Sequence, residues 1–120
     1  AGGGGLLRLP QRIPYAIAME LALTGDNLSA VRAHELGLVN VLTEPGAALD
    51  AALELAERIT ANGPLAVAAT KRIIVESPDW SDAEKWEKQG AILGPIFMSK
   101  DAREGAVAFA EKRAPQWTGS

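Results

Sequence analysis

Apolar side chains recur every three to four positions along most of this sequence, a spacing that is typical of helices with one buried face. The first such segment covers residues 15–23, in which Ile17 and Leu21 fall on the same helical face. Pro14 suits the first turn of this helix, and Gly25 is expected to end it in a left-handed conformation. The chain is therefore expected to be mainly helical.

Capping residues and helix breakers mark the other expected helices. Ser29 can cap a short helix that Gly37 closes, and Gly63-Pro64 ends one helix and begins the next. The sequence Ser81-Asp82-Ala83-Glu84 predicts a capping box, in which the serine hydroxyl and the glutamate carboxylate each bind a backbone amide. Asp101 is expected to cap the last helix. The expected helices cover residues 30–36, 47–61 and 64–76, a segment after the capping box, and a last segment that ends at Arg113 before Pro115.

One segment, residues 38–42, has the pattern of a short strand, because it is an apolar run broken only by Asn40. Pro45-Gly46 predicts a turn after it. A single strand cannot form a sheet, since its backbone edges would stay unpaired. The strand is therefore expected to pair with a segment outside this sequence or with another chain.

A run of four glycines, residues 2–5, precedes Leu6 and Leu7. Glycines before a helix often belong to a turn that leaves a strand, where the backbone passes close to another group. Such a run can also cradle phosphate, but a Walker motif would need a Lys-Ser/Thr pair after the glycines, and none is present. A tight strand-to-helix turn is the favoured interpretation.

Composition excludes several classes of protein. Twelve basic and fifteen acidic residues give a net charge of −3, which argues against a nucleic-acid binder with a clustered basic face. No cysteine is present, so the sequence offers neither a disulfide nor a thiolate metal site. No apolar run approaches the roughly 20 residues that cross a bilayer. A cytoplasmic protein without membrane or nucleic-acid partners is expected.

Candidate catalytic side chains are few. His34 is the only histidine, and no orienting partner is evident, so a surface or packing role is favoured over catalysis. The acidic residues fall at helix caps and on polar helix faces, where no desolvated acid or base is indicated. No metal site is expected. The indole rings of Trp80, Trp86 and Trp117 are expected to pack on apolar surface with their N–H groups in water.

A series of short motifs follows in a fixed order along essentially the whole chain: Gly3-Gly4-Gly5, Arg8-Leu9-Pro10, Ala18 to Gly25, Leu28-Ser29-Ala30, Ala33, Gly37-Leu38-Val39, Asn62-Gly63-Pro64, Thr70-Lys71, Ser99, Asp101, Glu104-Gly105, Ala108-Phe109 and Glu111-Lys112-Arg113. The order and spacing of these motifs resemble the crotonase family, which comprises the enoyl-CoA hydratases and isomerases. Two departures are Ile13-Pro14-Tyr15, where members commonly show a Val/Ile-Gly pair, and Arg32, which replaces an acid.

The resemblance implies the helical C-terminal part of a crotonase-like ββα-spiral fold. Residues 1–46 would form the end of the spiral core and residues 47–120 a helical domain that builds trimers. In the family, two glutamates and two oxyanion-hole amides carry the chemistry, and all lie before the segment that this chain resembles. No catalytic residue is therefore expected here. Gly2, Phe109 and Lys112 match substrate-binding positions, the last two at the coenzyme A site of a neighbouring subunit.

The function implied by the resemblance is that of the C-terminal portion of an enoyl-CoA hydratase, which hydrates trans-2-enoyl-CoA to 3-hydroxyacyl-CoA in fatty-acid metabolism. The coenzyme A thioester is the substrate, and no cofactor is expected. The partners would be acyl-CoA, an N-terminal half, and identical subunits in a trimer or a dimer of trimers. The 120-residue chain alone is expected to be inactive. Two alternatives remain: a naturally truncated, non-catalytic interaction module, or a fragment of an enoyl-CoA isomerase.

Overall fold

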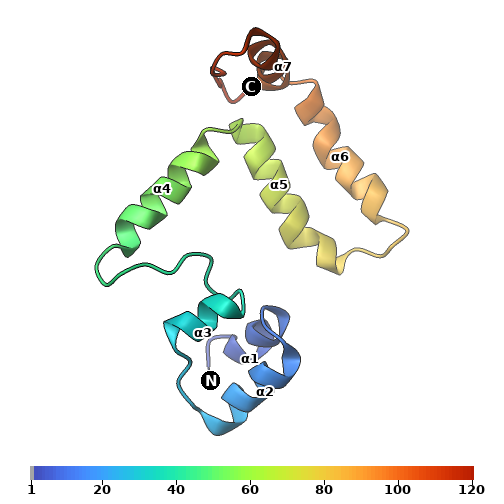
Figure 1. Cartoon of the computed structure of the whole chain (residues 1–120). Helices are drawn as coiled ribbons and strands as arrows, with labels where there is room; N and C mark the ends of the chain where they lie inside the picture. The colour runs from blue at the N-terminus through green and yellow to red at the C-terminus, as the bar shows by residue number, and fades with distance from the viewer. Residues whose placement is uncertain (1) are drawn as a thin grey trace. The chain divides into compact units, whose positions relative to one another are not determined.

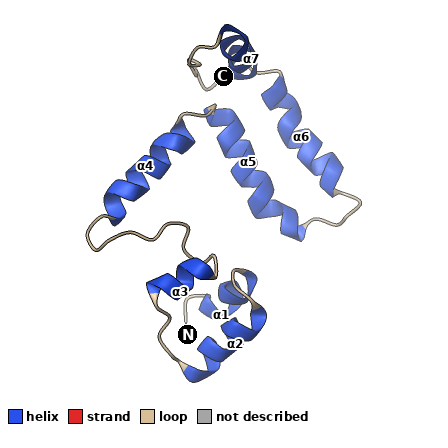
Figure 2. Cartoon of the chain, viewed as in Figure 1, coloured by secondary structure: helices blue, strands red, loops and turns tan. Residues whose placement is uncertain are grey.

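The computed structural model describes residues 2–120, and every regular element in this range is helical (Figures 1 and 2). The mainly helical fold is thus confirmed. The chain divides between Leu53 and Glu54 into two compact units, and the predicted domains, residues 1–46 and 47–120, remain a prediction. The elements are α1 (Gly5–Arg8), the 3-10 helix η1 (Leu9–Gln11), α2 (Tyr15–Thr24), α3 (Ala30–Glu35), α4 (Ala48–Thr60), α5 (Pro64–Glu76), the 3-10 helix η2 (Ser77–Asp79), α6 (Lys85–Phe97) and α7 (Lys100–Glu111).

Two helix ends of the first unit follow the sequence prediction, whereas Pro14 lies at the N-cap of α2 and not in its first turn. Helix α2 ends at Gly25, whose φ of 73° lies in the left-handed region that glycine tolerates. The Ser29 hydroxyl accepts a hydrogen bond from the Arg32 amide at 3.2 Å and so caps α3. The small side chains Ala18 and Ala33 are the buried residues of α2 and α3. Small buried residues allow short helices to approach closely.

The predicted strand over residues 38–42 is wrong, because the structure places these residues in a turn and a loop. The amides of Leu38 and Val39 both donate to the Ala33 carbonyl, at 2.9 and 3.3 Å, and so complete the end of α3. A helix satisfies its own backbone, whereas a strand needs a partner. The described residues 2–120 contain no strand that could pair with residues 38–42.

In the second unit, α5 and α6 lie side by side and are joined by η2 (Figure 1). Helix α5 begins at Pro64, as predicted, since proline lacks the N–H that the first helical turn leaves unpaired. The buried apolar residues of this unit are the small side chains Ala69 and Ala108. No large side chain within residues 2–120 is fully buried.

The predicted capping box before α6 forms only in part. The Ser81 amide donates to the Glu84 carboxylate at 3.1 Å, as expected. However, the Ser81 hydroxyl also donates to this carboxylate and caps no amide. Hydrogen bonds from Ser81 and Lys88 lower the pKa of Glu84 to about 2, so this carboxylate is ionised at neutral pH.

The predicted N-cap of the last helix is also wrong. The Ser99 hydroxyl, and not the Asp101 carboxylate, caps α7 by accepting from the Ala102 amide at 3.0 Å. Asp101 lies one residue inside the helix, which leaves its carboxylate available for another partner.

Apolar side chains remain exposed in both units. On α4, Leu49 and Ile59 have exposed fractions of 69% and 46%. Phe97, at the end of α6, is 73% exposed. None of the helices within residues 2–120 combines the length and the apolar character that crossing a bilayer requires.

Candidate functional site

The predicted ligand residues Phe109 and Lys112 lie together at the C-terminal end of α7. The Phe109 side chain is 87% exposed, and Lys112 is also exposed. Lys112 is the cap of the helix, and its amide donates to the Phe109 carbonyl at 3.2 Å. The structure therefore places an exposed aromatic ring and an exposed cation at one helix end.

The backbone at Lys112 has a conformation that lysine rarely adopts. Its φ of 55° and ψ of 38° lie in the left-handed region, and within residues 2–120 no other residue except glycine has a positive φ. This conformation costs a residue with a side chain roughly 1–2 kcal/mol, which is why glycine usually occupies the position. The Arg113 amide donates to the Ala108 carbonyl at 3.0 Å and completes a Schellman-type helix end.

Arg113 forms a two-pronged ion pair with Glu104, which lies two turns earlier on α7. The two guanidinium nitrogens Nη1 and Nη2 contact the two Glu104 oxygens at 2.6 and 3.0 Å. The Gln116 amide also donates to Glu104, at 2.7 Å. These contacts, Arg113 first, lower the pKa of Glu104 to about 2, and Glu104 in turn raises the pKa of Arg113.

The tail that follows α7 folds back along this helix and binds Asp101. Asp101 is 4% exposed, and its carboxylate accepts from the Thr118 amide at 2.7 Å, the Thr118 hydroxyl at 2.9 Å and the Gly119 amide at 2.9 Å. The pKa of Asp101 is lowered, chiefly by the Thr118 amide and against the opposing effect of burial. The sequence analysis missed this contact because the partners lie 17 and 18 residues away.

Trp117 fixes the same tail to the corner between α4 and α5. Its indole N–H donates to the Ala61 carbonyl at 2.9 Å, so the predicted water contact is wrong for this tryptophan. The ring lies over Gly63 and Gly105, where an added Cβ would come within 3.6 and 3.2 Å of it. Gly105 could have revealed the contact, since glycine inside a helix is unfavourable unless something approaches closely.

Gly2, the third predicted ligand residue, is exposed near the start of the described residues. Gly3 and Gly4, which follow it, have φ values of 65° and 83° and form a turn into α1. The turn into a helix agrees with the interpretation of the glycine run, but the described residues contain no strand before it. Gly2 belongs to the first unit and Phe109 to the second, so neither unit by itself brings the three predicted residues together.

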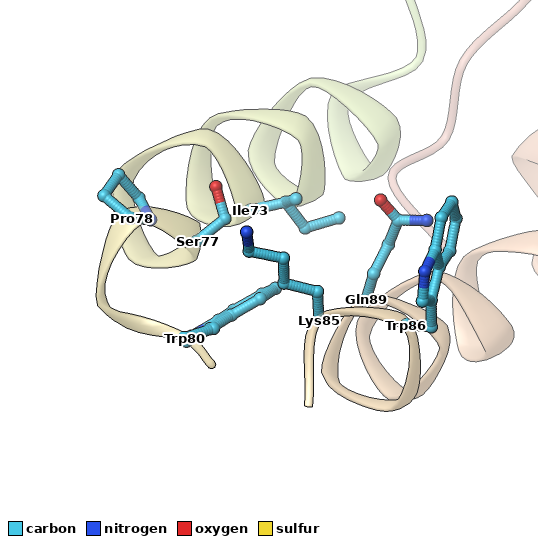
Figure 3. Close-up of a pocket in the computed structure, with 7 residues that line it drawn as sticks. All are labelled: Ile73, Ser77, Pro78, Trp80, Lys85, Trp86 and Gln89. Atoms are coloured by element: carbon cyan, nitrogen blue, oxygen red, sulfur yellow. The ribbon is translucent and has the colours of Figure 1, made fainter. Parts of the chain in front are cut away.

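A separate open cavity of about 460 Å³ lies between the end of α5, η2 and the start of α6 (Figure 3). None of the predicted ligand residues lines it. Figure 3 shows Trp80 and Trp86 on opposite sides of this cavity, with Lys85 and Gln89 between them. Lys85 is paired with Asp82 at 2.6 Å. The cavity thus combines two indole rings with few free polar groups.

The described residues offer no recognisable catalytic constellation. His34 is exposed, as expected, and no histidine, aspartate or glutamate cluster within residues 2–120 is suited to a metal ion. Glu84, Asp101 and Glu104 have lowered pKa values, and each is occupied by hydrogen bonds. A general acid or base near neutral pH needs a raised carboxyl pKa, so these three groups serve structure.

Comparison with known proteins identifies the family. The profile described as enoyl-CoA hydratase/isomerase matches residues 1–120. The chain belongs to this family. The resemblance to the crotonase family in the sequence is thereby confirmed.

Individual members of the enoyl-CoA hydratase/isomerase family are similar to this chain in sequence and structure. The chain is 46% identical over 115 residues to the enoyl-CoA hydratase EchA19 of Mycobacterium tuberculosis, which covers 96% of this chain and 43% of that protein. It is 41% identical to the carnitinyl-CoA dehydratase of Salmonella arizonae, covering 97% of this chain and 46% of that protein. The crystal structure of the enoyl-CoA hydratase EchA1 from Mycobacterium marinum matches with a TM-score of 0.97 and 77% identity, over 100% of this chain and 48% of that one. The chain thus spans about half the length of these relatives, as expected for a C-terminal portion.

Proposed function

We propose that this chain is the C-terminal portion of an enoyl-CoA hydratase, which adds water to trans-2-enoyl-CoA and forms 3-hydroxyacyl-CoA in fatty-acid metabolism. The observation that carries the proposal is the 77% identity, over the whole of this chain, to a protein described as an enoyl-CoA hydratase. The whole-chain match of the family profile supports the same chemistry.

Within that enzyme, the chain contributes to substrate binding and not to proton transfer. Hydration requires donors that hold the developing enolate oxygen and a group that moves a proton between water and carbon. The carboxylates with shifted pKa values, Glu84, Asp101 and Glu104, are ionised and engaged. The catalytic groups are therefore assigned to the half of the relatives that this chain does not cover, and the chain alone is inactive.

Phe109 and Lys112 are the proposed contacts to the coenzyme A part of the substrate. A largely exposed aromatic ring can pack against the ligand, and an ammonium group on the same helix end can bind its phosphate. Gly2 is proposed to lend backbone to the pocket around the reacting water. Coenzyme A enters as part of the substrate, and the reaction needs no further cofactor.

The assembly is proposed to contain the N-terminal half and identical subunits, as a trimer or a dimer of trimers in the cytoplasm. The exposed apolar side chains on several helices support the proposal that this chain packs against a partner. Since Phe109 would reach the substrate of a neighbouring subunit, assembly and substrate binding are coupled in this proposal.

A second candidate function is water elimination from a hydroxyacyl-CoA. It is favoured by the 41% identity to a carnitinyl-CoA dehydratase, a name that describes loss of water from a coenzyme A thioester. The family description also includes isomerases, and an isomerase fragment or a non-catalytic module are the remaining alternatives.

A substrate panel separates these functions. The chain is co-refolded with the half of the Mycobacterium marinum enoyl-CoA hydratase that it does not cover, and turnover of crotonyl-CoA, carnitinyl-CoA and a 3-enoyl-CoA is measured. The largest kcat/KM is expected for hydration of crotonyl-CoA. A preference for carnitinyl-CoA would favour the dehydratase, and double-bond migration without hydration would favour the isomerase.

The Lys112 contact is tested in the same complemented protein. Lys112→Ala is expected to weaken binding of coenzyme A by about tenfold, the usual scale for one charge-assisted hydrogen bond. It should also flatten the dependence of affinity on salt, because one screened charge pair is lost. Unchanged affinity at low salt would remove Lys112 from the site.

A further inference from the structure

Lys112 occupies a backbone position that glycine would fill without strain. Its left-handed φ of 55° closes α7, and no other residue with a side chain within residues 2–120 has a positive φ. Backbone strain at a residue other than glycine supports a functional hypothesis for its side chain. Contacts elsewhere in the chain must therefore stabilise the left-handed conformation of Lys112.

We propose that the Glu104–Arg113 ion pair is a positioning device that fixes Lys112 for coenzyme A, an inference that rests on the proposed function. Arg113 directly follows Lys112, so its side chain governs the direction in which the chain leaves the helix. Both prongs of its guanidinium bind Glu104, at 2.6 and 3.0 Å. A two-pronged contact fixes orientation as well as distance.

The tail reinforces this arrangement beyond Arg113. Glu104 also accepts from the Gln116 amide at 2.7 Å, so one carboxylate holds the chain on both sides of Pro115. Asp101 then holds the Thr118 amide at 2.7 Å. Because the chain after Lys112 is fastened to α7 at successive points, the left-handed turn cannot relax by simple fraying of the helix end.

The ion pairs at this end of α7 do not involve the Lys112 ammonium group, which can therefore bind a ligand. Its neighbour Glu111 is engaged by Arg113, whose Nε donates to it at 2.6 Å. None of the ion pairs within the described residues includes Lys112. Arg113 therefore does two things: it anchors the turn through Glu104, and it engages the carboxylate of Glu111, the residue directly before Lys112.

Three variants test this inference, with coenzyme A as the probe in the complemented protein. Glu104→Gln removes the two-pronged contact and is expected to weaken coenzyme A binding about as much as Lys112→Ala, with no further loss in the double variant. Arg113→Lys keeps the charge but cannot bind both oxygens, and it should weaken binding in the same direction. Glu76→Gln is the matched control, because it breaks the exposed Arg72–Glu76 pair and should leave affinity unchanged.

Lys112→Gly separates positioning from simple stabilisation. It is expected to raise the midpoint of thermal unfolding, because glycine relieves the left-handed strain, while it lowers coenzyme A affinity. If Lys112 had only a structural role, the substitution would not raise the unfolding midpoint and lower coenzyme A affinity at the same time. The Cα and Cβ chemical shifts of Lys112 in the 120-residue chain provide a readout that does not depend on binding, and Glu104→Gln should move them away from left-handed values.

The outcomes distinguish this inference from the proposed function. A loss of affinity in Lys112→Ala with none in Glu104→Gln or Arg113→Lys contradicts the positioning role and leaves the coenzyme A contact intact. Unchanged affinity in Lys112→Ala contradicts the contact itself, and the inference with it. Left-handed shifts of Lys112 that persist in Glu104→Gln would also overturn the positioning role.

Discussion

At the scale of single residues, the sequence predicted those contacts whose partners lie nearby in the chain. Gly25 and Ser29 end and begin helices through groups within four residues, and their residue types suffice to predict this. Asp101 and Trp117 bind groups that lie 17 and 56 residues away. Their residue types fit many environments, so their roles became evident only in the folded chain.

Trp117 is expected to stabilise the second unit through its indole N–H. Trp117→Phe keeps an aromatic ring but leaves the Ala61 carbonyl without its partner, which should lower the free energy of unfolding by about 1 kcal/mol. Trp86→Phe is the control, since Trp86 is 79% exposed. Denaturant unfolding of both variants measures the difference, and equal midpoints would show that the Ala61 contact contributes nothing.

Acid should release the tail from α7. Folding lowers the pKa of Asp101 and lowers that of Glu104 to about 2, so the unfolded chain binds more protons as the pH falls below about 4.5. The stabilisation is therefore complete near neutral pH and is lost as the pH falls toward 2. In unfolding experiments from pH 7 to pH 2, Glu104→Gln should differ most from the original chain at neutral pH. A difference that grows on acidification would contradict this account.

At the scale of elements, the helices were predictable and the strand was not. Helices such as α5 form their backbone hydrogen bonds internally. The helical spacing of apolar residues, with Pro64 at the start, was therefore sufficient to predict α5. Residues 38–42 have a strand-like pattern, but pairing depends on a partner that the described residues do not supply. The capping box formed only in part, because the Ser81 amide binds the Glu84 carboxylate as predicted but the Ser81 hydroxyl binds this carboxylate instead of an amide.

Two serines before helices are therefore expected to differ in their effect on stability. Ser99→Ala removes the hydroxyl that accepts from the Ala102 amide and should cost about 1 kcal/mol. Ser81→Ala removes a hydroxyl that caps no amide and keeps the Ser81 amide contact to Glu84, so it should cost less. Thermal unfolding of the two variants, followed by circular dichroism, compares them directly. A larger loss for Ser81→Ala would contradict the observed capping.

At the scale of the whole molecule, the sequence motifs predicted the family, and comparison confirmed it over all 120 residues. The chain covers 43% of one relative and 48% of the other whose structure matches, and the apolar side chains on α4 and α6 stay exposed. The order of the motifs could predict the family and the partial coverage, because related proteins keep the same motifs in the same order. Which catalytic groups complete the site is implied by the family resemblance alone, because none of the chain's own residues predicted a catalytic role.

The purified chain is not expected to behave as a compact monomer. Exposed residues such as Leu49 and Phe97 favour association with identical chains or with an N-terminal half, because association removes them from water. Sedimentation velocity over a range of concentrations measures this, with the added M. marinum half as a second condition. A compact monomer that binds no second chain would contradict the proposed assembly.

Hydration of crotonyl-CoA tests the central claim most directly, which is that this chain supplies substrate contacts but no catalytic groups. The assay is run on the 120-residue chain alone and after co-refolding with the complementary half of the Mycobacterium marinum enzyme. Loss of even one oxyanion donor typically lowers a rate about 10²–10³-fold, so the chain alone should show no turnover, and activity should appear only on complementation. Turnover by the chain alone, persisting after removal of any longer contaminant, would contradict the account.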